Sequence, residues 1–527
     1  RVFQLVTNGY IRAVGRLLQF SMVVAVLYCG LLYVTWQQFD SAPTGFIPAQ
    51  DKGYLLVNVQ LPDSAALERT MRVMQQIEEI AGKSPGVRHT MAISGQSLII
   101  NAKAPNFGTL YVILDDFDHR SPQGLSSAVI ARTLQTSLDQ SISNAIVNIF
   151  GAPVIDGLGT SGGFRLVIED RGDLGLAALQ TVNDRIVQQG AEIGGLTDLF
   201  SSFRGNTPWL SLDIDRDAVK LRHVSLAEVF STLQVNFGSF YVNDINRFGR
   251  TWQVNVQADA KYRMTNDDLK RVYLRSDVGS MVPLASVVTV REATGPTILN
   301  RYNLYSSAIV SANPAVGTSS GQALERLARV AQECISPSMR TEWTELALLQ
   351  QNVSQTAMFA FLLAVILVFL VLAAQYESWA LPLAVILVVP MCLLCSVAGV
   401  LTAGFDITIF TQIGFVVLVG LACKNSILIV EFARAGHDRG LSCRQATLDA
   451  CKLRLRPIVM TSLAFVIGVV PLMIGQGAGA EMHNTLGTAV FYGMLGVTLF
   501  GVFLTPVFFF LIQRVADWTR RRGEDRQ

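Results

Sequence analysis

The residues Ala357-Met-Phe-Ala-Phe-Leu-Leu-Ala-Val-Ile-Leu-Val-Phe-Leu-Val-Leu-Ala-Ala374 include no charged side chain, no proline and no glycine. A helix needs about 20 apolar residues to cross the hydrocarbon core of a bilayer, and this stretch approaches that length. The wider region 353–432 carries four charged residues: Glu377, Asp406, Lys424 and Glu431. This charge density is far below that of soluble proteins. The region therefore predicts a bundle of membrane-spanning helices.

Six segments of the chain meet the same criterion of length and apolarity. They are Leu17–Phe39, Ala357–Ala374, Leu381–Ala403, Ile407–Phe432, Pro457–Gly475 and Leu486–Ile512. Lys and Arg gather before the first span, in the loop 433–456 and in the tail 514–527. Basic loops stay on the cytoplasmic side of a membrane. We therefore expect both termini inside and the long segment 41–352 outside.

The composition also indicates a membrane protein. The chain has 527 residues, of which 50% are hydrophobic and 16% charged, and its mean hydropathy is +0.39. Its net charge of +2 provides no basic excess for binding nucleic acid. Six of the seven cysteines lie in or beside apolar segments or in the basic loop, so a disulfide scaffold is not expected. Because the chain begins at Arg1 rather than Met, we expect a fragment or a processed product.

The segment expected outside the membrane alternates strand and helix patterns. Strands are predicted at Gly53–Leu61, Leu110–Leu114, Ala145–Phe150, Phe164–Glu169, Trp252–Ala258 and Ile298–Ser311. Helices are predicted at Asp63–Ala81 (with Asp63 or Ser64 as N-cap), Ser127–Ser137, Leu176–Gln189 and Ser320–Gln332. We interpret this order as two split βαβ subdomains, the second interrupted by an inserted α+β module. The expected organisation has a first helix in 1–40, subdomains at 41–157 and at 158–207 with 297–345, an insert at 208–296, five helices in 353–513 and a basic tail at 514–527.

Two glycine motifs do not support an enzyme. Gly157, Gly159 and Gly162 fit GxGxxG, and Gly159–Gly163 fits GxSxG, but both motifs require a helix to follow. Here the pattern of Phe164–Glu169 is that of a strand, so we predict a glycine-rich loop between the subdomains. No Walker-type phosphate loop occurs, so an ion gradient is the expected energy source. The cluster Asp115, Asp116, Asp118 and His119 is interpreted as an acidic turn, and neither a metal site nor a cofactor is expected.

Lys424 is the residue most out of place in the predicted spans. It lies in the fourth span, seven residues before Glu431, and a buried ammonium in a membrane costs a few kcal/mol unless it is solvated or paired. One interpretation is a lysine whose long side chain reaches the headgroups. The other is a lysine that faces the bundle interior and pairs with a titrating carboxylate, with Asn425, Thr461 and Gln412 completing a polar path. Only Asp406 and Glu431, at the ends of the fourth span, offer acidic groups, so the acid is expected from another segment or chain. Transporters are often built from two related halves, and this chain is interpreted as one half.

Several long motifs resemble those of the resistance–nodulation–division multidrug efflux pumps, over essentially the whole chain. They are Phe46-Ile-Pro-Ala-Gln-Asp51, Gln375-Tyr-Glu-Ser-Trp379, Lys424-Asn-Ser-Ile-Leu-Ile-Val-Glu431 and Arg454-Leu-Arg-Pro-Ile-Val-Met-Thr461. The chain is similar to the C-terminal half of such a pump, with residues 157–170 and 246–257 closest to the MexF/OqxB branch.

The resemblance implies a homotrimeric proton–drug antiporter in the inner membrane of a Gram-negative bacterium. Lys424 would pair with two aspartates supplied by the N-terminal half, and Arg454, Thr461 and Asn425 would belong to the same proton relay. A periplasmic adaptor protein and an outer-membrane channel are the other implied partners. The implied docking module is the insert, in which Tyr241, Asn243 and Asp244 lie near an arm that reaches a neighbouring protomer.

The resemblance also places amphiphilic drugs between the two subdomains. A flexible loop, Ser94–Gly108 including Gly95, would divide two pockets. The pocket positions are Met91, Gln96, Leu98, Tyr111, Asn148 and Phe150. Better-known relatives carry phenylalanine at several of these positions, so we expect less stacking on planar drugs here. The alternatives are a heavy-metal or lipid exporter of the same superfamily, and a receptor-like membrane component that does not transport.

Overall fold

The computed structural model describes residues 2–524, so the last residues of the predicted basic tail, 525–527, lie outside the described residues. The chain divides into two compact units. One comprises Arg1–Phe203 with Leu299–Gln527, and the other is Arg204–Ile298, which contains the predicted insert 208–296.

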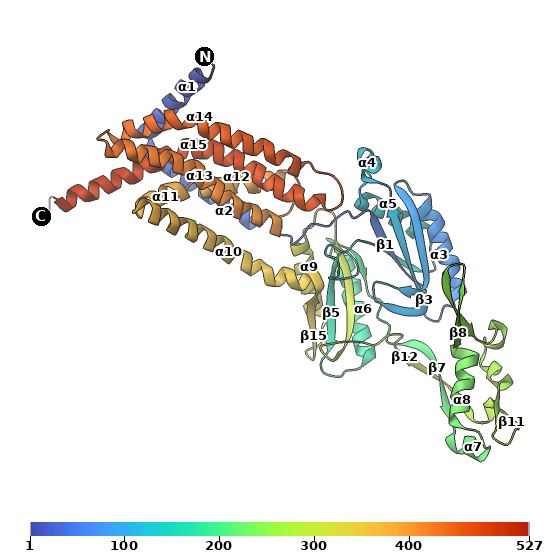
Figure 1. The fold of residues 1–527 in the computed structure, drawn as a ribbon. Helices are drawn as coiled ribbons and strands as arrows, with labels where there is room; N and C mark the ends of the chain where they lie inside the picture. Colours follow the sequence, from blue (N-terminus) through green and yellow to red (C-terminus); the bar gives the residue numbers. More distant parts are fainter. Residues whose placement is uncertain (1, 525–527) are drawn as a thin grey trace. The chain divides into compact units, whose positions relative to one another are not determined.

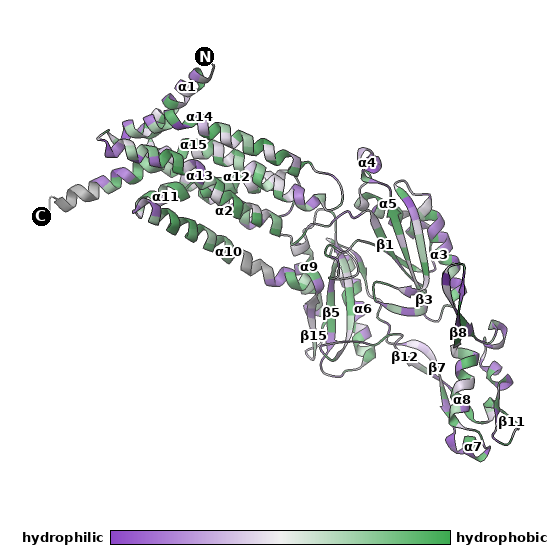
Figure 2. Ribbon diagram, viewed as in Figure 1, coloured by the Kyte–Doolittle hydropathy of each residue, from purple (hydrophilic) through white to green (hydrophobic). Residues whose placement is uncertain are grey.

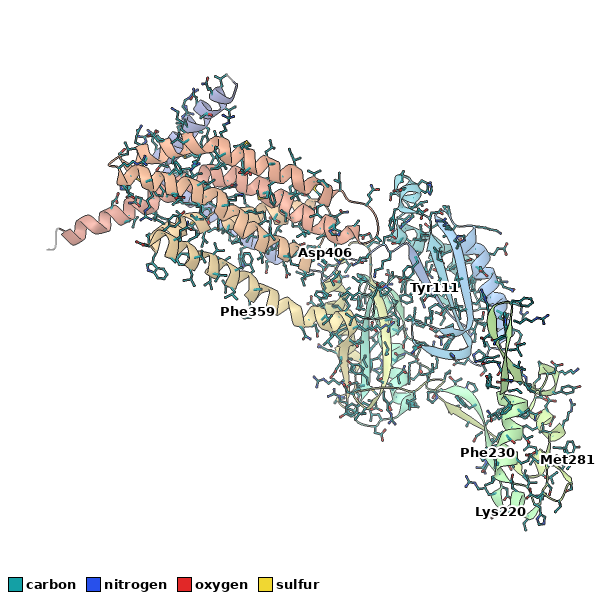
Figure 3. The ribbon with its side chains drawn as sticks, viewed as in Figure 1. Tyr111, Lys220, Phe230, Met281, Phe359 and Asp406 are labelled. Carbon is teal, nitrogen blue, oxygen red and sulfur yellow. The ribbon has the colours of Figure 1, made fainter. Side chains whose placement is uncertain are left out.

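Helices, most of them long and apolar, form one part of the first unit (Figure 1). They are α1 (Val2–Gln19), α2 (Ser21–Ser41), α10 (Glu345–Tyr376), α11 (Ala380–Ile386), α12 (Val389–Thr402), α13 (Ile409–Asp438), α14 (Cys443–Met473) and α15 (Ala480–Glu524). Most of their residues are hydrophobic (Figure 2). Among the described residues, six candidate spans are long and apolar enough to cross a membrane, as predicted. Side chains on the outside of the bundle, such as Phe359 (Figure 3), are exposed within this chain.

The predicted start of the first span needs correction, whereas the span predicted at Leu381–Ala403 matches the candidate span Ala380–Thr402 within one residue. The first span was expected from Leu17, but α2 begins at Ser21 because the helical path is interrupted at Phe20 (φ −102°, ψ 32°). The span Leu381–Ala403 consists of α11 and α12, with Pro390 in the first turn of α12. Proline lacks an N–H and clashes with the preceding helical turn, so a continuous helix is broken at this point.

The helix α15 packs against α12, α13 and α14. Glycines make this close packing possible: a Cβ on Gly493 would overlap the side chain of Leu418, and one on Gly399 would overlap the ring of Tyr492. The buried core of the bundle is almost entirely apolar. A few buried hydroxyl and amide groups in this core are therefore conspicuous, and they mark the site described below.

The first α+β subdomain contains β1 (Tyr54–Gln60), α3 (Leu67–Gly82), β2 (Val87–Ser97), β3 (Ala102–Leu114), α5 (Ser127–Ser141) and β4 (Ile146–Gly151). Its antiparallel sheet has the order β2-β3-β1-β4. Alternate residues of each strand, such as Val57 and Leu110, form a core with α3 and α5. The opposite face of the sheet is free of these helices. The predicted start of the helix α3 at Asp63 is wrong, because a turn from Pro62 to Ala65 delays it to Leu67.

The second α+β subdomain has a sheet in the order β13-β14-β5-β15, with β6 also paired to β14. Its strands are β5 (Phe164–Asp170), β6 (Leu196–Phe200), β13 (Asn300–Tyr302), β14 (Tyr305–Pro314) and β15 (Met339–Thr344). The helices α6 (Leu176–Glu192) and α9 (Ser320–Cys334) pack on one face of the sheet. The sequence patterns did not predict β2, β6 or β15.

The second unit contains three two-stranded sheets and two short α-helices. Its small apolar core includes no residue of the hairpin 240–256 in the described chain. Its elements are β7 (Thr207–Ile214), α7 (Arg216–Leu221), α8 (Leu226–Leu233), β8 (Phe240–Arg247), β9 (Arg250–Val256), β10 (Tyr273–Arg275), β11 (Met281–Pro283) and β12 (Val288–Gly295). The strands β7 and β12 pair along their whole length. The hairpin β8–β9 is exposed along nearly all its residues.

The connection from α2 to β1 is held by backbone hydrogen bonds and one buried ion pair. Segment 43–46 bonds to the residues just before α13, with Gly45 N–H donating to the Ile407 carbonyl at 3.0 Å. Further along, the carboxylate of Asp51 accepts from both terminal nitrogens of Arg120 at 2.5 and 2.6 Å. The two residues are 7% and 2% exposed. Such a bidentate pair is strong only while both partners are present.

We expect Asp51→Asn to lower the free energy of unfolding by about 3–5 kcal/mol, because the guanidinium of Arg120 would stay buried without its counter-charge. The measurement is denaturant unfolding of the purified protein in detergent. Glu79→Gln removes the exposed Lys83–Glu79 pair and is the matched control, with little expected effect. Equal stability of Asp51→Asn and the control would refute the assignment.

Acidification should act through the same group. Burial alone would raise the pKa of Asp51, but hydrogen bonds from Arg120, Ser127 and Gly53 outweigh it and lower that pKa. The stabilisation is therefore present above the unfolded-state pKa of about 3.9 and is lost as the pH falls through the folded-state pKa. When the free energy of unfolding is measured as the pH is lowered, Asp51→Asn should lack this loss of stability. The same acid profile in Asp51→Asn and in the unmutated protein would contradict the role of Asp51.

Candidate functional site

Lys424 lies on an exposed face of α13. The helix begins with a capping box, in which the hydroxyl of Thr408 accepts from the backbone N–H of Thr411. Lys424 follows four turns later and is exposed, whereas its neighbours Cys423 and Asn425 are buried. Within the described part of the chain, the ammonium of Lys424 makes no hydrogen bond and no ion pair. It therefore presents an unpaired charge at the surface of an apolar bundle.

Buried polar pairs adjoin Lys424. The amide of Asn425 donates to the hydroxyl of Ser462 at 3.0 Å, and the hydroxyls of Ser426 and Thr505 lie 3.0 Å apart. All four side chains are buried. These pairs join α13 to α14 and α15. The sequence analysis missed Ser462 and Thr505, although a polar residue inside a span was a usable signal.

Thr461 lies at the same level as Lys424, because the Asn425–Ser462 hydrogen bond aligns the two helices at this point. The side chain of Thr461 is exposed, and its hydroxyl donates to the carbonyls of Pro457 and Ile458 at 3.0 and 3.1 Å. Pro457 stands inside α14, where it removes one helical hydrogen bond. Two predicted relay residues, Lys424 and Thr461, thus share one exposed region.

Arg454 is not adjacent to Lys424 in this chain. Its guanidinium lies over the ring of Phe432, with Cζ 3.5 Å from the ring centre. Phe432 follows Lys424 by eight residues, about 12 Å along the helix. The buried Nε of Arg454 has no hydrogen-bond partner among the described residues. Gln412 lies about 18 Å from Lys424 in the other direction along α13. Arg454 and Gln412 therefore lie on opposite sides of the level of Lys424, and in the described chain neither residue contacts Lys424.

The face of α13 and α14 around Lys424 is not covered by the described chain. On α13 it includes the exposed residues Ile413, Val416 and Val417. On α14 it includes Met460 and Ile467. Gly420 and Gly468 have open space where a side chain would begin. We call this surface the Lys424 face. Small and apolar residues around one charge suit close packing against further helices.

Four of the predicted drug-binding residues lie on the helix-free face of the first sheet: Met91, Tyr111, Asn148 and Phe150. Strand pairing places Met91, Tyr111, Leu56 and Phe150 in one row across β2, β3, β1 and β4. Asn148 occupies the next row. Met91 is 49% exposed, whereas Phe150 is 1% exposed. Tyr111 is labelled in Figure 3.

Phe150 is buried in a cluster that spans both subdomains. Leu56, Ile99 and Phe200 complete its buried part, and Tyr54, Ile100 and Tyr111 pack against it. Phe200 comes from β6, a strand that the sequence analysis did not predict. Beside the cluster, the amide nitrogen of Asn148 and the amide oxygen of Gln60 are buried without partners among the described residues. The region thus combines aromatic and amide groups.

The segment Ser94–Gly108 is a hairpin rather than the predicted loop. Residues up to Ser97 belong to β2 and residues from Ala102 belong to β3. Ser94 pairs with Gly108, and Gln96 pairs with Lys103, with an irregular register between them at Gly95. Leu98 and Ile99 lie in the connecting turn. A Cβ on Gly108 would overlap the side chain of Met74 in α3, so a larger residue would have to displace that side chain.

The glycine motifs lie in a connecting loop, as predicted. Residues 152–163 contain no helix or strand, and β5 follows at Phe164. Gly157, Gly159 and Gly163 have positive φ angles. Of the acidic turn, Asp116 pairs with Arg88 at 3.1 Å on an exposed surface. Among the described residues, no three His, Cys, Asp or Glu side chains are grouped as metal ligands.

The predicted docking residues lie on β8 in the second unit. Tyr241 is opposite Asn255, Asn243 is opposite Val254 and Asp244 is opposite Gln253, with a bulge after Tyr241. All three side chains are exposed.

Comparison with known proteins identifies the family to which the chain belongs. The family model of the AcrB/AcrD/AcrF family matches residues 1–513. The chain belongs to the AcrB/AcrD/AcrF family. It is thus a relative of efflux pumps and a multi-pass membrane protein.

Similar members of the AcrB/AcrD/AcrF family come from two bacteria. The toluene efflux pump membrane transporter TtgB of Pseudomonas putida is 34% identical over 514 residues, 97% of this chain and 48% of TtgB. The multidrug export protein AcrF of Escherichia coli is 33% identical over 522 residues, 96% of this chain and 49% of AcrF. The multidrug resistance protein MdtF, also of Escherichia coli, is 31% identical over 513 residues, 97% of this chain and 48% of MdtF. The chain spans about half the length of the curated relatives it matches.

We expect Ser462→Ala to lower the free energy of unfolding by about 1–3 kcal/mol, because the buried amide of Asn425 would lose its acceptor. The double variant Asn425→Leu with Ser462→Ala should recover much of this loss, since both polar groups are then removed. Unfolding of the purified variants in detergent measures both effects. Additive losses in the double variant would show that the two side chains do not depend on each other.

Proposed function

We propose that this chain is the C-terminal half of a proton-driven pump that exports amphiphilic small molecules. Membership of the AcrB/AcrD/AcrF family supports export, and the half-length match to TtgB, AcrF and MdtF supports a missing half. The pump would be a secondary transporter rather than an enzyme, located in the inner membrane of a Gram-negative bacterium. The motifs at 157–170 and 246–257 support a place in the MexF/OqxB branch.

The unpaired ammonium of Lys424 carries this proposal. A charge on an exposed apolar face is costly in a membrane unless another group neutralises it. The Lys424 face has the small residues needed for close helix packing, so we propose that the N-terminal half docks on it. That half would supply the two aspartates expected from the resemblance.

The proposed coupling follows from electrostatics. Deprotonated aspartates attract the ammonium of Lys424, and protonation removes that attraction. Helices that are held by the pairing can then shift to a second arrangement. Thr461, level with Lys424, and Asn425, paired to Ser462, would line the proton path. Arg454, two turns away, would act at its cytoplasmic end.

We propose that the drugs contact the helix-free face of the first sheet. Met91, Gln96, Leu98, Tyr111, Asn148 and Phe150 would line the site, and Phe200 of the second subdomain joins them through the shared cluster. The unpartnered amides of Asn148 and Gln60 suit hydrogen-bonding groups on a substrate. The pump would act as a homotrimer with an adaptor protein and an outer-membrane channel. The exposed hairpin β8–β9, with Tyr241, Asn243 and Asp244, is the proposed docking arm.

We expect Lys424→Ala to abolish proton-gradient-dependent dye export, because the aspartates would lose the charge whose attraction they switch. The measurement is dye transport in membrane vesicles that contain this chain with its N-terminal half. Lys452→Ala removes an exposed lysine of α14 and is the matched control, with transport retained.

Correct trimer assembly of Lys424→Ala must be verified beside the transport assay. Undiminished transport would make Lys424 a residue that only reaches the headgroups and would overturn the proposed coupling. Transport by neither the variant nor the unmutated protein would favour a receptor-like component.

A further inference from the structure

Arg165 makes a set of contacts that the transport proposal does not use. It is the second residue of β5, opposite Thr344 of β15. One terminal nitrogen of its guanidinium pairs with the carboxylate of Glu345 at 2.8 Å. The other donates to the carbonyl of Ile99 at 3.1 Å and to the hydroxyl of Thr160 at 2.5 Å. The side chain of Arg165 is 11% exposed and that of Glu345 26%. The guanidinium thus joins three separate segments.

Glu345 is the first residue of α10, the helix that contains the second candidate span. Its φ angle is +55°, in the left-handed region that disfavours residues other than glycine. The loop containing Thr160 also approaches closely, because a Cβ on Gly159 would lie 2.7 Å from a carboxylate oxygen of Glu345. A strained backbone persists only where its surroundings hold it, and here the surroundings include the ion pair with Arg165.

The third segment is the tip of the β2–β3 hairpin. The carbonyl of Ile99 accepts from both Arg165 and Thr160. The side chain of the same residue is 3% exposed and packs in the cluster with Leu56, Phe150 and Phe200. Arg165 therefore fixes the residue that covers this cluster, one position after Leu98.

We propose that Arg165 and Glu345 form a tether between the start of the helix α10 and the tip of the β2–β3 hairpin. Arg165 is a positioning residue: it holds Ile99 over the Phe150 cluster while Glu345 holds Arg165. A change in direction at the start of α10 moves the carboxylate and releases the hairpin tip. The role of this tether in substrate access rests on the proposed export function. The structural link between the two segments does not depend on that function.

Hydrogen–deuterium exchange of the complete protein tests the link without requiring transport. In Arg165→Ala, the amides of residues 95–104 should lose about tenfold or more of their protection, as expected for losing hydrogen bonds to a charged group. Arg165→Lys keeps the charge but lacks the forked guanidinium that reaches two segments. The protection of residues 95–104 in Arg165→Lys should therefore lie between that of Arg165→Ala and that of the unmutated protein. Glu345→Gln should also increase exchange at the tip.

Arg171→Ala is the matched control. Arg171 follows β5 at its other end and pairs with Glu169 and Glu342 at 2.6 and 2.7 Å, without contact to the hairpin. Its loss should leave the exchange of residues 95–104 unchanged. Glu345→Gly relieves the positive φ angle but removes the carboxylate, so the hairpin should still be released. Wild-type protection in Glu345→Gly or in Arg165→Ala would overturn the tether.

Transport then separates the two proposals. With dye export working in the unmutated protein, Arg165→Ala should raise the apparent KM for the dye several-fold, and Arg171→Ala should not. An unchanged KM with a released hairpin would overturn the role in substrate access. If the unmutated protein exports nothing, the proposed function fails, and the exchange result still decides whether the tether exists.

Discussion

The bidentate pair between Asp51 and Arg120 secures the first of two places at which the chain passes between its long helices and its sheets. The segment that carries Asp51 also bonds to the residues before α13, near Asp406 (Figure 3), and to the start of α9 through Thr44. One short stretch of backbone thereby engages the bundle and both α+β subdomains. At the second passage, from β15 into α10, Arg165 and Glu345 form another ion pair. At both passages a guanidinium bonds a carboxylate and backbone carbonyls: Arg120 also donates to the carbonyls of Asp115 and Leu125, and Arg165 to that of Ile99.

Periodicity and apolar length were enough to predict much of this architecture. The six spans follow from long stretches with few charges. Such a stretch suits the apolar interior of a bilayer, and there a helix satisfies its backbone hydrogen bonds. Strands such as β1 and β5 and helices such as α5 and α6 follow from alternation and from helical spacing. The strands β2, β6 and β15 were missed because their half-exposed residues lack a clear alternation. The loop Ser94–Gly108 was expected from the family resemblance alone, and its two strands, which end at Ser97 and begin at Ala102, were not predicted from the residues themselves.

The site was harder to predict because it depends on tertiary neighbours. Lys424 is conspicuous in any apolar segment, and its position on an uncovered face could not be read from one helix alone. Ser462, Thr505 and Phe200 gain their roles only when α14, α15 and β6 are placed beside α13 and β4. Arg454 shows the same dependence on tertiary structure. It shares a motif with Thr461, yet it lies over Phe432, about two helical turns from the level of Lys424.

Pro457 lies between these two positions on α14. A proline in a helix leaves the carbonyl four residues earlier without its usual donor, so the bond that resists bending there is already missing. The helical turns that carry Arg454 and Thr461 are therefore joined through a turn that lacks one backbone hydrogen bond. The hydroxyl of Thr461 donates to the carbonyl of Pro457 itself, so a side chain of the Lys424 face is bonded directly to that turn. The loss of the backbone hydrogen bond and the added side-chain hydrogen bond thus fall within two successive turns of one helix.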